Sequence, residues 1–262
     1  MNHLLTDKHA AQYERDGYFF PIPVLSQAEV ARYRAAFDAV EAHAGGTLTR
    51  LDLSHLYFRW AYDLATHPAL VDAVEAVMGP DLLIQATLIF CKYPGNDAFV
   101  SWHQDSVYLK WHLTPSISAW LALTDSTVES GCMRVIPGSH RQGLQPHVEI
   151  KSAKNLLRRG EQVRVTVNED EAVDMALRAG QMSLHHNTII HGSNPNRSEA
   201  RRIGFIVRFV TSQLRESPFP VVQVRGHGDI GHLPVLEVPP APAPVAASYR
   251  NWQRYMAQRK TA

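Results

Sequence analysis

Cysteine is scarce in this sequence, with only Cys91 and Cys132 among 262 residues. Two cysteines form at most one disulfide, so a disulfide-stapled secreted fold is excluded and a reduced, cytoplasmic chain is the simpler expectation. No apolar run is long enough to cross a bilayer, and residues 1–10 lack the regions of a signal peptide. We therefore expect no membrane partner.

The chain also lacks an excess of charge of either sign, because its formal net charge is +1. No overall field attracts it to nucleic acid, so nucleic acid is not an expected partner. Hydrophobic residues make up 45% of the chain, which suits one globular domain over residues 1–262. A C-terminal extension at about 217–262 is set apart by proline, since residues 217–244 hold seven of the sixteen prolines.

Local patterns divide the chain into a helical part and a strand-rich part. Helices are predicted at about 6–15, 26–42 and 68–78, with a short edge strand at 18–24. Strands are predicted at 82–93, 99–103, 117–123, 133–136, 162–167, 181–185, 189–191 and 203–210. The fold class expected is mainly β with flanking helices, around a double-stranded β-helix, or jelly-roll, core.

The most informative stretch for chemistry is Trp102-His103-Gln104-Asp105. In an extended segment alternate residues share a side, so His103 and Asp105 would point the same way. With a second histidine, for which His191 is the best candidate, they would form the two-His, one-carboxylate facial set that binds Fe(II). Taken by itself, His-x-Asp is more often a polar turn beside a buried histidine, and a zinc hydrolase is a further alternative.

The residues after His191 favour the iron hypothesis. Turn residues at 194–200 lead into the apolar strand at 203–210, and Arg201 and Arg202 stand at its start. A guanidinium there suits the far carboxylate of a dicarboxylic acid whose other end chelates the metal. Fe(II) with three open positions accepts two atoms of a 2-oxo acid and one O2. A zinc hydrolase would leave the arginine without a purpose.

At this point the chain resembles the phytanoyl-CoA dioxygenase family of Fe(II)- and 2-oxoglutarate-dependent oxygenases, from about residue 6 to 211. The resemblance is carried by residues 13–20, 103–105, Trp120, 131–133, 137–140, 191–193 and Arg202. It implies that His103, Asp105 and His191 hold the metal, and that Arg202, eleven residues past the distal histidine, anchors 2-oxoglutarate rather than Arg201. It also implies that Trp120 and Ser193 contact this co-substrate.

Other positions carry weaker expectations. Gln85 and Thr87 share a face of their strand and are predicted to point toward the co-substrate, whereas Lys92 does not share it. Tyr108, Lys110, Trp111 and His112 either line the substrate pocket or form a loop, and His185 and His186 are expected to support the site or the core. The basic stretch 141–164 is either a lid for an anionic substrate or, more simply, a solvated loop. The C-terminal helix expected from 248 to 258 either covers the site or is loosely held.

We expect an Fe(II)-dependent dioxygenase with 2-oxoglutarate and O2 as co-substrates. It is expected to hydroxylate an unactivated carbon of a small molecule, with anionic and carrier-tethered substrates among the candidates. The short chain without an organelle address favours bacterial metabolism or natural-product biosynthesis. The same iron core also serves desaturation, cyclisation and epimerisation. A metal-binding jelly roll without turnover is an alternative of another class. The sequence does not indicate an oligomeric state.

Overall fold

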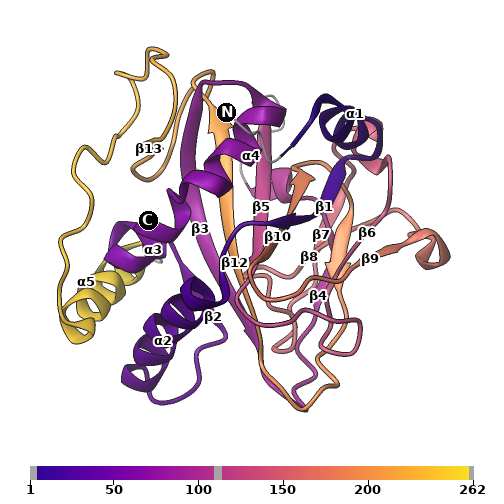
Figure 1. The fold of residues 1–262 in the computed structure, drawn as a ribbon. Coiled ribbons are helices and arrows are strands. Elements are labelled where there is room, and N and C mark those ends of the chain that lie inside the picture. The colour runs from indigo at the N-terminus through magenta and orange to yellow at the C-terminus, as the bar shows by residue number, and fades with distance from the viewer. Residues whose placement is uncertain (1–4, 109–113, 260–262) are drawn as a thin grey trace.

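The computed structural model describes residues 5–108 and 114–259 (Figure 1). The first half of the chain forms α1 (Asp7–Asp16), β1 (Tyr18–Pro23), α2 (Gln27–His43), β2 (Arg50–Asp52), η1 (Ser54–Leu56), α3 (Arg59–Ala65), α4 (Pro68–Met78), β3 (Leu82–Lys92), β4 (Val100–His103), η2 (Asp105–Tyr108) and β5 (Ser116–Ala122). The second half forms β6 (Met133–Val135), η4 (Ser139–Gln142), β7 (His147–Glu149), β8 (Glu161–Val163), η5 (Glu169–Glu171), β9 (Val173–Met175), β10 (Gln181–His186), β11 (His191–Ser193), β12 (Arg202–Thr211), β13 (Val222–Gln223) and α5 (Val245–Gln258).

Two antiparallel sheets form the centre of the molecule. The larger has the order β1-β10-β5-β12-β3-β13, with β2 also paired to β3, and the smaller has the order β4-β11-β6-β9. Neighbouring strands in each sheet come from distant parts of the chain, as a jelly roll requires. The predicted fold class is confirmed.

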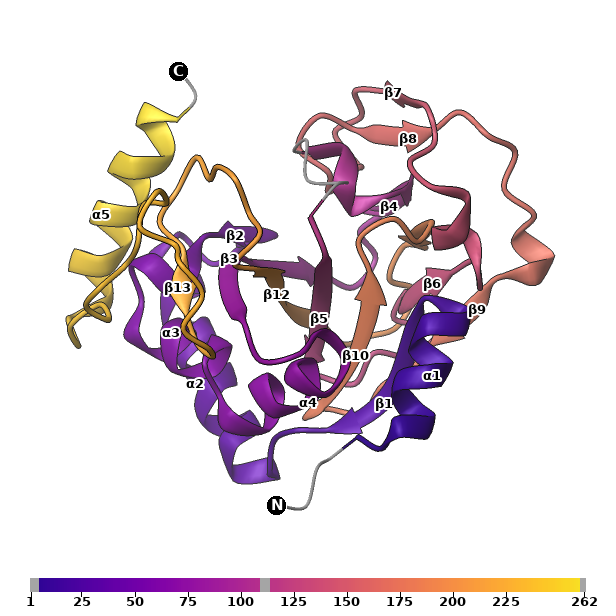
Figure 2. The same cartoon turned by 90° about the horizontal axis from the view of Figure 1, so that it is seen from above.

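The two faces of the larger sheet have different partners. Helices α2, α3 and α4 cover its outer face and share one apolar core with it, in which Phe37, Leu64, Leu70 and Phe205 are fully buried (Figures 1 and 2). Its inner face packs against the smaller sheet through a second cluster that includes Trp120, Met133 and Ile206. Strand β12 is therefore buried on both faces, which explains its nearly continuous apolar sequence.

The main differences from the predicted elements are local. The three predicted helices and the edge strand β1 are present, but α3 and β2 were not expected, because segments of seven and three residues carry too little periodicity. The stretch 102–105 is not extended throughout. Strand β4 ends at His103 and Asp105 begins the 3-10 helix η2, so the alternation argument for these two residues is corrected.

The C-terminal extension is held against the rest of the molecule rather than being loose. Helix α5 lies beside α2 in both ribbon views (Figures 1 and 2). Its Trp252 donates a hydrogen bond from Nε1 to the carbonyl of Asp52 at 2.7 Å, and Tyr255 packs on Tyr57 with ring centroids 5.4 Å apart. The basic stretch 141–164 is likewise structured in part, since it contains β7 and its hairpin leads into β8.

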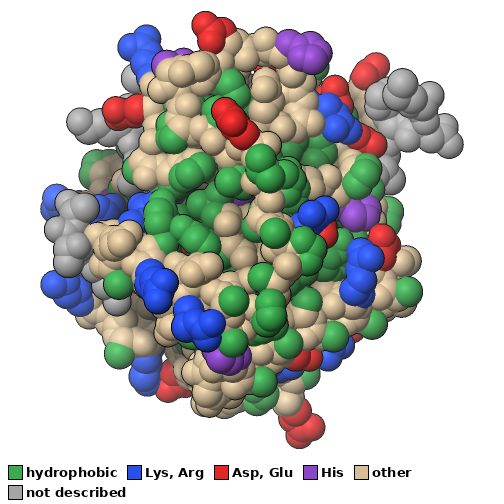
Figure 3. Space-filling model, turned by 90° about the vertical axis from the view of Figure 1, so that its left-hand side faces the viewer, with side chains coloured by type: hydrophobic (Ala, Val, Ile, Leu, Met, Phe, Trp, Pro, Cys, Tyr) green, Lys and Arg blue, Asp and Glu red, His purple; other side chains and the backbone are tan. Residues whose placement is uncertain are grey.

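None of the helices in the described ranges is both long enough and apolar enough to span a membrane. On the face shown in Figure 3, lysine and arginine side chains are scattered among apolar and acidic ones rather than gathered into one patch. This agrees with the nearly balanced charge of the sequence.

Candidate active site

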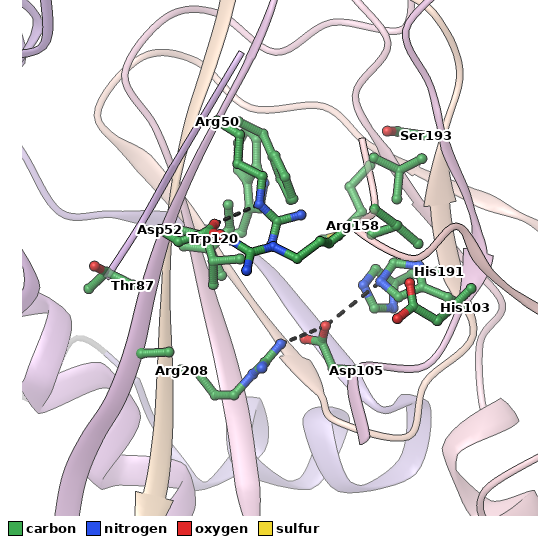
Figure 4. Close-up of a pocket in the computed structure, with 18 of the residues that line it drawn as sticks. Arg50, Asp52, Thr87, His103, Asp105, Trp120, Arg158, His191, Ser193 and Arg208 are labelled. Atoms are coloured by element: carbon green, nitrogen blue, oxygen red, sulfur yellow. Dashed lines mark hydrogen bonds and ion pairs between the residues drawn. The ribbon is translucent and has the colours of Figure 1, made fainter. Parts of the chain in front are cut away.

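Three metal-binding side chains meet between the two sheets. His103 ends β4, Asp105 opens η2, and His191 opens β11 directly opposite His103 in the antiparallel register (Figure 4). All three are buried, and one ligand atom from each lies within 4.8 Å of the other two. The pairing of β4 with β11 therefore brings together residues that are far apart in the sequence.

The hydrogen bonds of the two histidines fix which ring nitrogen faces the cluster. Nδ1 of His103 lies 2.9 Å from the carbonyl of Ser101, and Nδ1 of His191 lies 3.0 Å from the carbonyl of Ile189. A carbonyl only accepts, so each Nδ1 donates, and Nε2 is the ring nitrogen left to face the cluster. Burial, followed by the nearby His103 and His185, holds the pKa of His191 well below its usual range, which keeps this ring neutral.

Asp105 is held on both of its oxygens. Arg208 of β12 forms an ion pair with Oδ1 at 2.8 Å, and Ser118 of β5 donates to Oδ2 at 2.6 Å. His185 of β10 also approaches Oδ2, at 3.5 Å. Burial would raise the pKa of Asp105, but Arg208, with His103 and His185, outweighs burial and holds this pKa well below its usual range. The carboxylate is therefore ionised and fixed in place.

Arg208 was not recognised from the sequence as part of the site. The available signal was a lone charged residue inside the apolar run 203–210, at a position that the structure buries. His185 was expected to be a core or supporting histidine, and the structure places it beside Asp105 and His191. His186 points elsewhere, toward Thr188 and the ring of His140.

The two neighbouring arginines at the start of β12 have different surroundings. Arg201 forms ion pairs with Asp38, at 2.9 Å, and with Glu41. Arg202 is 2% exposed, lines the cavity and lies 5.1 Å from the ring of Trp120. Its Nε is buried without a hydrogen-bond partner, and within 5–108 and 114–259 it forms no ion pair. Burial lowers the pKa of Arg202 to about 10, so it is still a cation at neutral pH.

The remaining predicted site residues divide into two groups. Trp120 and Ser193 line the same cavity as Arg202 (Figure 4). Thr87 also borders it, but its hydroxyl is bonded to Ser54 and His55. Gln85 is buried and does not line the cavity, because it alternates along β3 with Ala86 and Leu88, which do. Lys110, Trp111 and His112 lie outside the described residues.

Lys92 also belongs to this region, although no role was predicted for it. It is fully buried opposite Arg202 in the ladder and donates from Nζ to Ser193 Oγ at 2.6 Å. The carbonyl of Asn194 accepts from the same amine. Lys92 thus fixes the Ser193 hydroxyl and the turn after β11.

A cavity of about 500 Å³ extends outward from the buried cluster. Its inner end holds His103, Asp105, His191, Arg202 and Arg208, and its wall includes Leu88, Phe90, Met133 and Ile206. Pockets of this size accommodate a small organic molecule, and this one has more room than a five-carbon co-substrate needs. The arrangement offers a metal site and a cation for an anion at the same end of one cavity.

Comparisons with known proteins agree with this geometry. The family model for phytanoyl-CoA dioxygenase (PhyH) matches residues 13–204. The solved structure of apo ThoJ, a non-heme monooxygenase, is 30% identical, with a TM-score of 0.79 and 96% of each chain covered. A probable alpha-ketoglutarate-dependent hypophosphite dioxygenase of Stutzerimonas stutzeri is 26% identical over 196 residues, which are 72% of this chain and 64% of that protein. The peroxisomal phytanoyl-CoA dioxygenase of Bos taurus is 24% identical over 228 residues, with 77% and 67% covered.

The jelly roll, its buried His-Asp-His cluster and these similarities define an iron- and 2-oxoglutarate-dependent oxygenase. Within that class, the chain belongs to the phytanoyl-CoA dioxygenase family. It spans about two thirds of the length of the two curated relatives described above.

Proposed function

We propose that this protein hydroxylates an unactivated carbon of a small-molecule substrate. His103, Asp105 and His191 would hold Fe(II), and the cavity would take 2-oxoglutarate, O2 and the substrate. The donor set fits this metal, because two imidazole nitrogens and one ionised carboxylate gather at one end of the cavity. When bound, iron supplies the oxidising chemistry that couples the splitting of 2-oxoglutarate into succinate and CO2 to oxidation of the substrate.

The single observation that carries the proposal is the environment of Arg202. Burying a guanidinium without an ion pair costs folding free energy unless a bound anion supplies the missing partner. The far carboxylate of 2-oxoglutarate would accept two parallel hydrogen bonds from it, with Trp120 packed alongside and Ser193 at the cavity wall. Neither Gln85, which lies outside the cavity, nor Thr87, whose hydroxyl is already bonded, is needed for this anchor.

Each remaining residue has a defined task. Arg208 and Ser118 hold the Asp105 carboxylate in one orientation, so this carboxylate does not rotate when the co-substrate binds. The apolar wall excludes water from the reacting carbon. Desaturation, cyclisation and epimerisation would use the same residues, so mass analysis of the product separates these outcomes from hydroxylation.

The test is the release of succinate on addition of Fe(II) and 2-oxoglutarate, together with a pair of matched variants. Arg202→Lys should weaken 2-oxoglutarate binding by roughly ten- to a hundredfold, because an ammonium does not reproduce the two-pronged contact. Arg201→Lys is the control, since a lysine keeps the charge opposite Asp38 and Glu41. Equal affinities in the two variants would show that Arg202 is not the anchor.

A further inference from the structure

The outer half of the cavity is a second charged site, distinct from the inner end. It is lined by Arg50 and Asp52 of β2, by Leu157, Arg158 and Arg159 before β8, and by Phe219, Met256 and Arg259 from the C-terminal part. The last three residues lie beyond residue 204, where the match to the family model ends. This part of the wall therefore lies outside the match to the family model, whereas Arg50, Asp52 and residues 157–159 lie within it.

Positive charge is in excess on this wall. Asp52 is shared by two guanidiniums, with Arg50 at 2.6 Å and Arg158 at 2.7 Å (Figure 4). Arg159 is matched by Glu161 at 2.7 Å and by Glu149 at 3.3 Å. Arg259 lies over the rings of Phe219 and Tyr255, and among residues 5–108 and 114–259 its buried Nη1 has no hydrogen-bond partner. Apart from the balanced Arg159, this wall thus carries three guanidiniums and one carboxylate.

Helix α5 is anchored to the same strand that carries the carboxylate. Trp252 donates to the backbone of Asp52, so the helix that bears Arg259 is fixed relative to Arg50 and Arg158. Other parts of the cavity wall are apolar, through Leu53, Ala86, Leu88 and Phe90. The cavity therefore presents a metal-ligand cluster, an apolar stretch of wall and a cationic rim.

We propose that this rim binds an anionic group, a carboxylate or a phosphate, at the end of the substrate remote from the carbon that reacts. The apolar body of the substrate would lie against the apolar part of the cavity wall. A partly exposed cluster of arginines recognises either anion through charge-assisted hydrogen bonds. The proposal rests on the proposed function, because that function defines which end of the substrate reacts. Binding of an anion at the rim is testable without any reaction.

The experiment measures binding of octanoate, octyl phosphate and octanol by calorimetry, at low salt, without oxygen and with saturating 2-oxoglutarate and Fe(II). The three probes share one alkyl chain and differ in the charge of the head group. Both anions should bind at least several-fold more tightly than octanol. Arg259→Gln and Arg158→Gln should each weaken anion binding by roughly three- to tenfold and leave octanol unchanged, a smaller effect than at a fully buried site because the rim is partly exposed.

Arg254→Gln is the matched control, because it removes the same charge from an exposed position of the same helix, outside the cavity. Its anion affinity should equal that of the parent. Equal binding of octanol and the anions, or equal losses in Arg254→Gln and Arg259→Gln, would overturn the proposal. If anion binding depends on Arg259 but no succinate is ever released, the rim site stands and the proposed oxygenase function fails.

Discussion

At the scale of single residues, the site depends on buried charges whose partners come from other strands. The pKa of Asp105 is lowered chiefly by Arg208 of β12, and Ser118 of β5 donates to the same carboxylate, although neither is near it in the sequence. Arg202 of β12 and Lys92 of β3 lie side by side but differ in their charge. Arg202 remains a cation, whereas burial, followed by the charge of Arg202, lowers the pKa of Lys92 to about 5.

The lowered pKa of Lys92 predicts a pH-dependent stability. The folded protein holds this amine neutral above about pH 5, whereas the unfolded chain keeps it protonated up to its ordinary, much higher pKa. The unfolded state therefore binds more protons between these values, and the free energy of unfolding should rise with pH, by up to about 1.4 kcal/mol per pH unit from this group. Cys132 and Arg202 are the other titratable groups facing it.

Urea denaturation at several pH values between 6 and 9 measures how the free energy of unfolding depends on pH. Lys92→Met, which keeps the length and loses the amine, should flatten the rise of stability with pH relative to the parent. Lys151→Met, at an exposed position, controls for the loss of one lysine. A slope in Lys92→Met as steep as in the parent would show that Lys92 stays charged in the folded protein.

At the scale of elements, β12 and β5 shape the co-substrate end of the cavity. Gly204 of β12 lies under the ring of Trp120, and a Cβ at this position would stand 2.1 Å from the ring atom Cζ2. The absence of a side chain lets the indole lie flat enough to border Arg202. The glycine interrupts an otherwise apolar strand for a steric reason.

Gly204→Ala should therefore displace Trp120. We expect a loss of about 1–3 kcal/mol in the free energy of unfolding, typical of overpacking, and a several-fold weaker affinity for 2-oxoglutarate. Denaturation curves and co-substrate titrations measure the two effects. Gly231→Ala is a suitable comparison, because a Cβ there meets only an Asp229 oxygen at 3.5 Å. An unchanged 2-oxoglutarate affinity in Gly204→Ala would separate Trp120 from co-substrate binding.

At the scale of the whole molecule, the cavity is bordered by two segments whose role was not clear from the sequence. The basic stretch 141–164 and the C-terminal extension were expected, in the simpler interpretation, to be solvated and loosely held. In the structure Leu157–Arg159 and the end of α5 both line the cavity. The packed core of the two sheets thus holds the chemistry, and the C-terminal part forms the outer wall.

Trp252→Ala should loosen this wall without disturbing the inner end. The indole N–H bond to Asp52 and the packing on Tyr249 would be lost, so hydrogen exchange of α5 amides should become faster while that of β12 stays unchanged. Substrate-free consumption of 2-oxoglutarate should remain close to that of the parent. Arg254→Ala, on the exposed side of α5, is the comparison. Unaltered exchange in Trp252→Ala would mean that other contacts hold the helix.

The sequence by itself determined the fold class, three of the helices and the positions of the chemistry. Strong apolar periodicity, capping residues and turn signals each involve residues close in the sequence, so they can be recognised without knowing the fold. For the same reason we could recognise the spacing of His103 and Asp105 and the position of Arg202 past His191. The structure brings these four residues to one end of one cavity.

Only the tertiary structure decided which charges meet. The register between β12, β3 and β5 sets Arg208 on Asp105 and pairs Lys92 with Arg202, and the packing of β3 turns Ala86, rather than Gln85, toward the cavity. The seating of α5 on β2 likewise depends on a contact between residues 52 and 252. Strand register and long-range packing are set by the sum of many weak contacts across the fold, so no short stretch of sequence encodes them.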